Sequence, residues 1–239
     1  MRVLGVRVDC LDMDAALERI AGLVETGDGG LVATVNPEIV MRARRDSEYA
    51  GVLESAALAL PDGFGVVWAL RRRECPDAVR VTGTDLLLRL PAIAAAHDWR
   101  VSFVGAGEGI AARAAARLQA EADGFRVAGI HVGSPRAEND DDAVEMLQRA
   151  RTQLVLVAYG FPEQERWIAR IRSRLPGIVG IGVGGAFDFV AGTVPRAPEW
   201  MRQSGTEWLF RLAVQPWRAR RMSVLPIYAL EVLRESRET

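Results

Sequence analysis

The sequence predicts an α/β fold of the doubly wound, Rossmann-like class, in which helices cover both faces of a mainly parallel sheet. Short apolar runs alternate along the chain with longer segments of helical periodicity, which is typical of parallel βαβ units. The runs are almost continuously apolar, as LVLVA at 154–158 shows, and strands of this kind are buried on both faces. Both observations favour a sheet sandwiched between two helical layers.

Five units of strand, turn and helix follow one another. Each apolar run leads into a loop of Gly, Asn, Asp or Pro, and the runs are LVATV (31–35), ALAL (57–60), RVSFVG (100–105), QLVLVAYG (153–160) and IVGIGVGG (178–185). Before them, residues 3–25 predict a strand or hairpin edge and then a helix with Asp12 as its N-cap.

The composition changes near residue 196, where the alternation of strands and helices ends. We therefore predict an α/β core at 1–195 and a basic, tryptophan-containing C-terminal helical appendage at 196–239. The segment 196–228 contains two acids, Glu199 and Glu207, against six arginines: Arg196, Arg202, Arg211, Arg218, Arg220 and Arg221. Tryptophan and arginine together are typical of a helix lying on an anionic membrane, and the alternative is a helix packed on its own core or on a partner subunit.

The bulk composition excludes several other classes of protein. The 239 residues are 49% hydrophobic and 26% charged, as in ordinary folded domains, and the net charge of −1 argues against a nucleic-acid partner. No run is long and apolar enough to span a membrane, and no secretory signal is evident, so we expect a cytoplasmic protein that lies peripherally on the inner face of the plasma membrane. An exposed apolar tail leaves self-association into homo-oligomers open.

The two cysteines predict neither a metal site nor a disulfide. Cys10 and Cys75 stand far apart in the sequence, without a CxxC pair or a neighbouring histidine cluster. We therefore expect reduced cysteines and no zinc site. We also expect no other metal and no cofactor.

The candidate site residues follow the strands, because ligands of open parallel sheets bind at the carboxyl ends of the strands. Asp62 in LPDGFG is either an ordinary turn residue or a general base. Thr34 and Asn36 in TVNPE either cap the next helix or line a pocket, and Gln164 stands in the first turn of its helix. Arg80 is either a solvated base or a phosphate clamp.

Two further sets of residues are candidates for contact with a nucleotide. Gly105 and Gly107 lie between a strand and a helix, where backbone N–H groups can approach a diphosphate, although a tight turn would use the same glycines. Asp188 stands between two phenylalanines and needs a partner to offset desolvation, which favours a ligand contact.

Six motifs, in this order, resemble the WecG/TagA/CpsF glycosyltransferases, which form glycosyltransferase family 26. They are TVNPE, LPDGFGVVW, VTGTDLL, GFPEQERWI, GVGGAFDFVAGTVPRAPEWM and GTEWLFRL, and together they span nearly the whole chain. The resemblance implies an inverting, metal-independent bacterial hexosyltransferase. Such an enzyme moves a sugar, N-acetylmannosamine or its uronic acid in many members, from a UDP-sugar to a polyprenyl-diphosphate-linked sugar. The products would enter teichoic-acid linkage units, common antigen, capsule or exopolysaccharide.

The resemblance also implies roles for individual residues. Asp62 would be the base, while Thr34, Asn36 and Gln164 would line the sugar pocket. Arg80 and the glycine loop would hold diphosphate charge, and Gly185 with Asp188 would lie near the nucleotide. The appendage would dock on the membrane, with the acceptor phosphates bound by Arg211, Arg218 and Arg221.

The chain departs from the family pattern at two places. Glu163 stands where many relatives have lysine beside the glutamine, and the far C-terminus keeps only a trace of the family's usual ending. The first puts donor or phosphate contacts in doubt, and the second puts acceptor docking in doubt.

Two alternatives to glycosyl transfer stay open at this point. One is an NAD(P)- or SAM-dependent Rossmann enzyme, although its glycine loop would follow the first strand, and here the loop follows two earlier βα units. The other is a non-catalytic adaptor that binds a membrane surface through the appendage. The sequence leaves the donor sugar open, UDP-glucose included.

Overall fold

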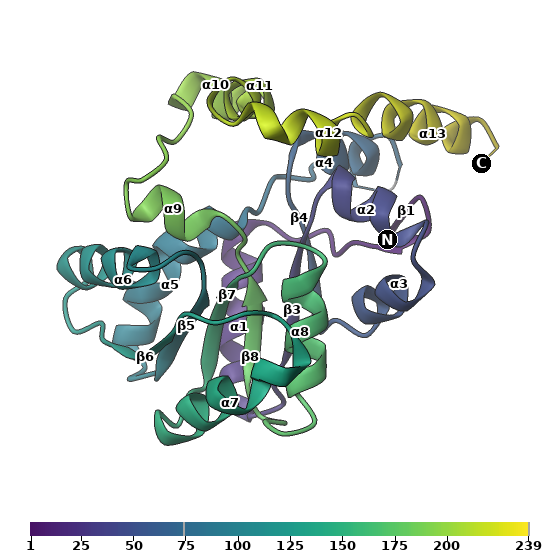
Figure 1. Cartoon of the computed structure of the whole chain (residues 1–239). Coiled ribbons are helices and arrows are strands. Elements are labelled where there is room, and N and C mark those ends of the chain that lie inside the picture. The colour runs from purple at the N-terminus through teal and green to yellow at the C-terminus, as the bar shows by residue number, and fades with distance from the viewer. Residues whose placement is uncertain (74, 239) are drawn as a thin grey trace.

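A six-stranded, wholly parallel sheet forms the centre of the molecule (Figure 1). The structure is a computed structural model and describes residues 1–73 and 75–238. The strand order is β4-β3-β8-β7-β5-β6. The strands are β3 (Gly30–Val35), β4 (Leu58–Pro61), β5 (Val101–Gly105), β6 (Val127–His131), β7 (Leu154–Ala158) and β8 (Val179–Gly182). A short antiparallel pair, β1 (Arg2–Val3) and β2 (Val6–Arg7), precedes them.

Helices cover both faces of this sheet. On each face, the helices and the sheet form one cluster of buried apolar side chains. One cluster joins the sheet to α1 (Met13–Thr26), α5 (Gly83–Ala96), α6 (Ile110–Glu121) and α9 (Ala186–Val190). The other joins it to α2 (Pro37–Ala43), α3 (Ser47–Glu54), α4 (Phe64–Arg71), α7 (Asp140–Arg149) and α8 (Glu163–Ile171). A short 3-10 turn at Ala137–Asn139 leads into α7. The predicted doubly wound α/β class is confirmed.

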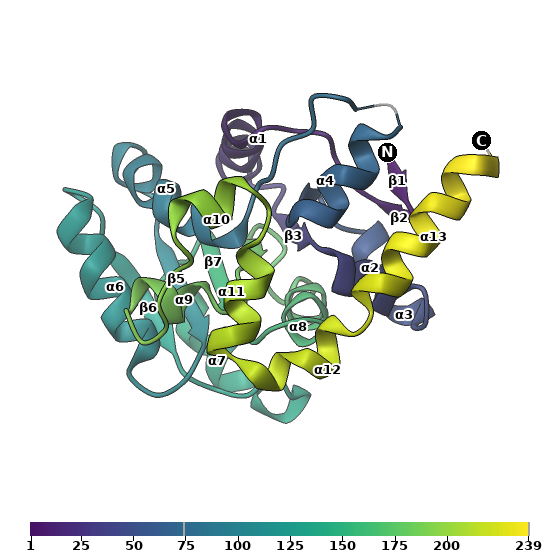
Figure 2. The ribbon, with the colours of Figure 1, turned by 90° about the horizontal axis from the view of Figure 1, so that it is seen from above.

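The last part of the chain lies across the carboxyl end of the sheet (Figures 1 and 2). It consists of α10 (Glu199–Gln203), α11 (Glu207–Val214), a 3-10 turn at Pro216–Arg218, α12 (Ala219–Met222) and α13 (Leu225–Glu238). Helix α13 is fixed to the body because Tyr228 and Val232 are buried in the second cluster, and the Tyr228 hydroxyl donates to the Gly65 carbonyl at 3.1 Å. The appendage is helical as expected, and the domain boundary at residue 196 stays a prediction.

The local predictions hold with two differences. Asp12 and Asn36 are N-caps whose side chains accept from the backbone N–H of Ala15 and Ile39. The helical segment after Asn36 is broken into α2 and α3, because Asp46 caps a second helix. Strand β6 was not predicted from the sequence. It is an edge strand whose residues are partly buried or exposed, and it contains Gly129, so it lacks the continuous apolar run of the other strands.

The prediction of two reduced cysteines is wrong for this structure. Cys10, after β2, forms a disulfide with Cys75, after α4, and their Cα atoms are 6.6 Å apart. The pair is separated by 65 residues in the sequence, and that separation does not reveal that the fold brings the two loops together. The bond therefore links the N-terminal segment to the loop that leads towards Arg80.

We predict that a Cys10→Ser, Cys75→Ser variant unfolds more easily than the oxidised protein. Removing a cross-link over a loop of this length lowers the free energy of unfolding by about 2–4 kcal/mol. Urea unfolding with and without reductant measures the difference, and the double variant should not respond to reductant. Two titratable thiols in the untreated, unfolded chain would contradict the prediction.

Candidate active site

A cavity of about 790 Å³ lies where the carboxyl ends of β3, β4, β7 and β8 meet the C-terminal helices. Nine of the predicted site residues line it: Thr34, Asn36, Asp62, Arg80, Gln164, Gly185, Arg211, Arg218 and Arg221. Its volume is in the range of pockets that hold a small-molecule substrate. The loops after β3, β4, β7 and β8 therefore converge in one cavity as predicted, whereas the glycine loop at 105–107 does not line it. The roles of these residues stay predictions.

Asp62 follows β4 directly and is held in place by the backbone. Its N–H donates to the Val35 carbonyl at 2.8 Å, and the next residue, Gly63, has a φ of 88°, which a side chain would disfavour. Removal from bulk water raises the pKa of Asp62 to about 7, although Arg211 and Arg80 act in the opposite direction. A carboxyl group with this pKa can accept a proton near neutral pH.

Thr34 and Asn36 both have partners within the protein. The Thr34 hydroxyl donates to the Gly182 carbonyl at 3.1 Å, which joins β3 to β8 at the edge of the cavity. The Asn36 side-chain oxygen accepts from Ile39 N–H at 3.0 Å. Asn36 thus has the capping role that its position also suggested, and its amide nitrogen has no hydrogen-bond partner among the described residues.

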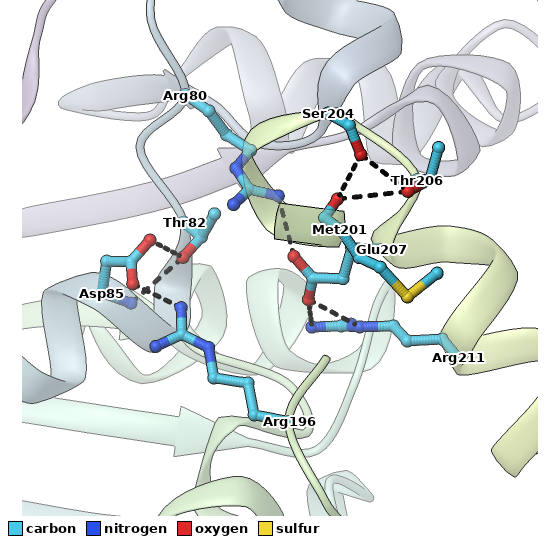
Figure 3. Close-up of polar contacts among 9 residues, drawn as sticks. All are labelled: Arg80, Thr82, Asp85, Arg196, Met201, Ser204, Thr206, Glu207 and Arg211. Carbon is cyan, nitrogen blue, oxygen red and sulfur yellow. Dashed lines mark hydrogen bonds and ion pairs between the residues drawn. The ribbon is translucent and has the colours of Figure 1, made fainter. Parts of the chain in front are cut away.

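Arg80 and Arg211 share a single carboxylate, that of Glu207 (Figure 3). Arg80 Nη1 is 2.8 Å from Glu207 Oε2, and Arg211 Nη2 is 2.9 Å from Oε1. Burial raises the pKa of Glu207, but the two arginines outweigh this effect and lower it overall. The ion pairs connect the core residue Arg80 to α11, so they hold the appendage against the body.

A second ion pair lies beside the first. Asp85, in the first turn of α5, accepts from the Thr82 hydroxyl at 2.7 Å and pairs with Arg196. This contact fixes the chain as it leaves the core for the appendage (Figure 3).

Arg218 and Arg221 bring further positive charge to the cavity. Arg221 Nε is 2.9 Å from Glu38 Oε2, and its guanidinium lies 4.4 Å from the centre of the Phe161 ring. Arg218 forms no ion pair with any described residue. Burial, together with Arg211 and Arg221, lowers the pKa of Arg218, although an arginine stays charged. Among the described residues, the carboxylates of Glu38 and Asp188 act on its charge from beyond ion-pair distance, so this guanidinium indicates a site for a further anion. The side chain of Arg202 is outside the described part of the chain.

Three predicted residues lie outside the cavity lining. Gly105 and Gly107 form the expected turn into α6, and Gly105 fits closely against Tyr159, since a Cβ there would be 2.9 Å from the ring. Asp188 is only half-buried, so it does not need the desolvation partner that the sequence suggested. Its carboxylate lies on the side of Gly185 and acts electrostatically on Arg218.

Sequence reasoning missed three residues of the site. Glu207 links two predicted arginines, and its spacing of four residues from Arg211 on a helix was the available signal. Glu165 is completely buried behind Gln164, and Tyr49 donates to it from α3 at 3.0 Å. The signal for Glu165 was its position three residues before Ile168, on the apolar side of α8.

An α/β fold with an aspartate of raised pKa and four arginines around one cavity indicates a site for an anionic substrate beside a group that can exchange a proton. A sequence model of the "Glycosyl transferase WecG/TagA/CpsF family" matches residues 1–239. The chain therefore belongs to this family of glycosyltransferases. This membership favours glycosyl transfer over the NAD(P)- or SAM-dependent enzyme and over the non-catalytic adaptor.

Several curated relatives have the same name, N-acetylglucosaminyldiphosphoundecaprenol N-acetyl-beta-D-mannosaminyltransferase. The protein of Bacillus subtilis (strain 168) is 36% identical over 209 residues, which cover 87% of this chain and 81% of the relative. That of Bacillus spizizenii is 34% identical over 90% of this chain and 82% of the relative. That of Staphylococcus aureus (strain NCTC 8325 / PS 47) is 29% identical over 99% of this chain and 93% of the relative.

We predict that Glu207→Gln lowers the pKa of Asp62. The Glu207 carboxylate raises that pKa, whereas Arg80 and Arg211 lower it, so a neutral residue at 207 leaves the two arginines uncompensated. The midpoint should move from about 7 to lower pH, by about one unit or less. Carboxyl ¹³C signals in NMR measure the titration. Glu207→Asp, which keeps the charge, should stay closer to the wild-type midpoint, and a rise in Glu207→Gln would contradict the prediction.

Proposed function

We propose that this protein transfers an N-acetylmannosamine-type sugar from a UDP-sugar to a polyprenyl-diphosphate-linked N-acetylglucosamine. The relatives' shared name supports the acceptor and the sugar. The observation that carries the proposal is Arg218, a partly buried guanidinium on which the charges of Arg211 and Arg221 act and which forms no ion pair with a described carboxylate. A diphosphate could pair with it directly, and both substrates contain one.

The proposed chemistry is a single displacement that inverts the configuration at the anomeric carbon of the transferred sugar. Asp62 takes the proton from the acceptor hydroxyl as that oxygen forms its bond to the anomeric carbon. The bond from this carbon to the diphosphate oxygen breaks, and UDP leaves with the electron pair. The cavity's arginines stabilise the charge that develops on the diphosphate, so we propose that the reaction needs neither a metal nor a cofactor.

The raised pKa of Asp62 suits the role of a base that takes up a proton near neutral pH. Its pKa of about 7 makes a fraction ionised at neutral pH, and that fraction grows as pH rises. General base catalysis is most effective when the pKa is near the working pH. Transfer should therefore increase with pH through about 7.

We predict that Asp62→Asn lowers turnover by about tenfold or more while UDP still binds. The amide fits the same space but cannot accept the proton. Mass spectrometry with a panel of UDP-sugars and a prenyl-diphosphate N-acetylglucosamine acceptor measures turnover, and calorimetry measures UDP binding. Asp98→Asn, on an exposed turn after α5, is the matched control. Unchanged turnover in Asp62→Asn would remove the residue from the proposed role.

We also propose that the appendage binds the inner face of the plasma membrane. No helix in the described chain has the length and apolar character needed to cross a bilayer. Exposed apolar side chains instead gather on α10, α11 and the turn before α12, with Trp200 66% and Trp217 72% exposed. Tryptophan at headgroup depth beside arginine is typical of interfacial binding.

We predict that Trp200→Glu with Trp217→Glu weakens binding to anionic vesicles several-fold, because two apolar contacts become charges of the same sign as the lipid. Cosedimentation with phosphatidylglycerol vesicles measures the loss. Leu88→Glu changes a residue on α5 that is 41% exposed, and this control should bind as the wild type does. Equal binding of all three proteins would contradict membrane docking through these tryptophans.

A further inference from the structure

Glu165 is a completely buried carboxylate that none of the described cationic side chains neutralises. Its relative exposure is 0%, and it forms no ion pair with any described residue, because the adjacent Arg166 pairs with Asp46, the N-cap of α3. It accepts hydrogen bonds from Gln164 Nε2 at 2.7 Å and from the Tyr49 hydroxyl at 3.0 Å. Burial, with a smaller effect of the Glu163 charge, raises the pKa of Glu165 to about 7, and the hydrogen bonds to the carboxylate oppose this rise. A buried carboxylate without a cation is costly, so its presence needs a reason.

The consequence of this contact is a fixed Gln164 side chain. In its ionised form, Glu165 can only accept hydrogen bonds, so the NH₂ end of the Gln164 amide then faces it, as the Nε2 contact shows. At the other end, Gln164 Oε1 accepts from Gly184 N–H at 3.0 Å. The amide therefore has one orientation, and it holds the Gly184–Gly185 turn at the cavity wall.

Strand β8 approaches Gln164 and Glu165 so closely at Gly182 that a side chain there would collide with them. A Cβ at Gly182 would lie 2.5 Å from Gln164 Nε2 and 3.0 Å from Glu165 Oε1. The carbonyl of Gly182 also accepts from Thr34, so the same strand end contacts two residues of the cavity lining. Tyr49 completes the set from outside the cavity, and its own pKa is raised, mainly by burial and then by the charge of Glu165.

We propose that Glu165 is a positioning residue for sugar transfer: held by Tyr49, it fixes the Gln164 amide and through it the Gly184–Gly185 turn. The orienting effect stands on this geometry, and its consequence for turnover rests on the proposed function. A glutamine at position 165 would fill the same space without a charge, but it could present either end of its amide to Gln164. The ionised carboxylate therefore presents only acceptors to Gln164, whereas the amide of a glutamine at 165 could also present its NH₂ group and compete with the contact to Gly184.

The kinetic test compares Glu165→Gln, Gln164→Ala and the double variant. Glu165→Gln should lose about ten- to a hundredfold in kcat/KM, as a misplaced group in a site does, with no decrease in Tm, since a desolvated charge is removed. The double variant should be no slower than Gln164→Ala, because Glu165 acts through Gln164. Tyr49→Phe should lose less activity in the same direction. Glu48→Gln, an exposed carboxylate beside Tyr49, should leave kcat/KM unchanged.

A structural readout tests the positioning independently of turnover. In ¹⁵N-edited spectra the Gln164 side-chain N–H donated to Glu165 should be shifted downfield and protected from exchange, and Glu165→Gln should lose both properties. Wild-type kcat/KM in Glu165→Gln, or an additive loss in the double variant, would overturn the proposal for turnover. Unchanged Gln164 signals in Glu165→Gln would overturn the positioning itself. A wild-type protein that transfers no sugar from the whole panel would defeat the proposed function instead, and the spectra would still decide the positioning.

Discussion

The contact of Glu207 with Arg80 and Arg211 is the interaction on which the cavity depends. Arg80 belongs to the α/β body and Arg211 to helix α11, so the Glu207 carboxylate joins α11 to the body, beside the ion pairs of Arg196 with Asp85 and of Arg221 with Glu38. Glu207 is nearly buried, and removing it would leave two close guanidinium groups without their shared partner. The appendage would then lose its polar attachment beside Asp62, although Tyr228 and Val232 would still hold α13. The site is thus assembled from two distant parts of the chain, and neither part alone encloses the cavity.

The charges around the cavity serve two requirements that oppose each other. A base must hold a proton with moderate affinity, which burial favours, because burial raises the pKa of Asp62 to about 7. A diphosphate needs positive charge, and the nearby arginines lower the same pKa. Glu207 reconciles the two, since it neutralises part of the charge of Arg80 and Arg211 next to Asp62. Arg218, on the appendage, forms no ion pair with a described carboxylate, so it contributes positive charge to the cavity that Glu207 does not neutralise.

The fold was predictable from the sequence because its strands are apolar on both faces and its caps are local. Asp12 and Asn36 cap their helices through contacts within three residues, which spacing alone reveals. Asp62 and Gln164 were predictable because the carboxyl ends of parallel strands share one edge. The Cys10–Cys75 pair and the contact of Glu207 with Arg80 depend on how distant segments meet, and no local pattern encodes that. Strand β6 was missed because an edge strand lacks the continuous apolar run.

Glu165 shows why the support of a site is harder to predict than its lining. A carboxylate in the first turn of a helix is ordinary when it is exposed, because it faces the positive end of the helix. Here the helical spacing turns Glu165 inward with Ile168, so the same residue becomes buried and must find donors. Gln164 and Tyr49 are those donors, and only the three-dimensional arrangement brings Tyr49 from α3. The stability cost is linked to pH: the pKa of Glu165 is higher in the folded state than its ordinary value, so folding loses stability as pH rises towards about 7. The pKa of Asp62 is also raised in the folded state, so its effect on stability changes with pH in the same direction. These two carboxyl groups therefore contribute least to the stability of the fold in the pH range where Asp62, the proposed base, is ionised.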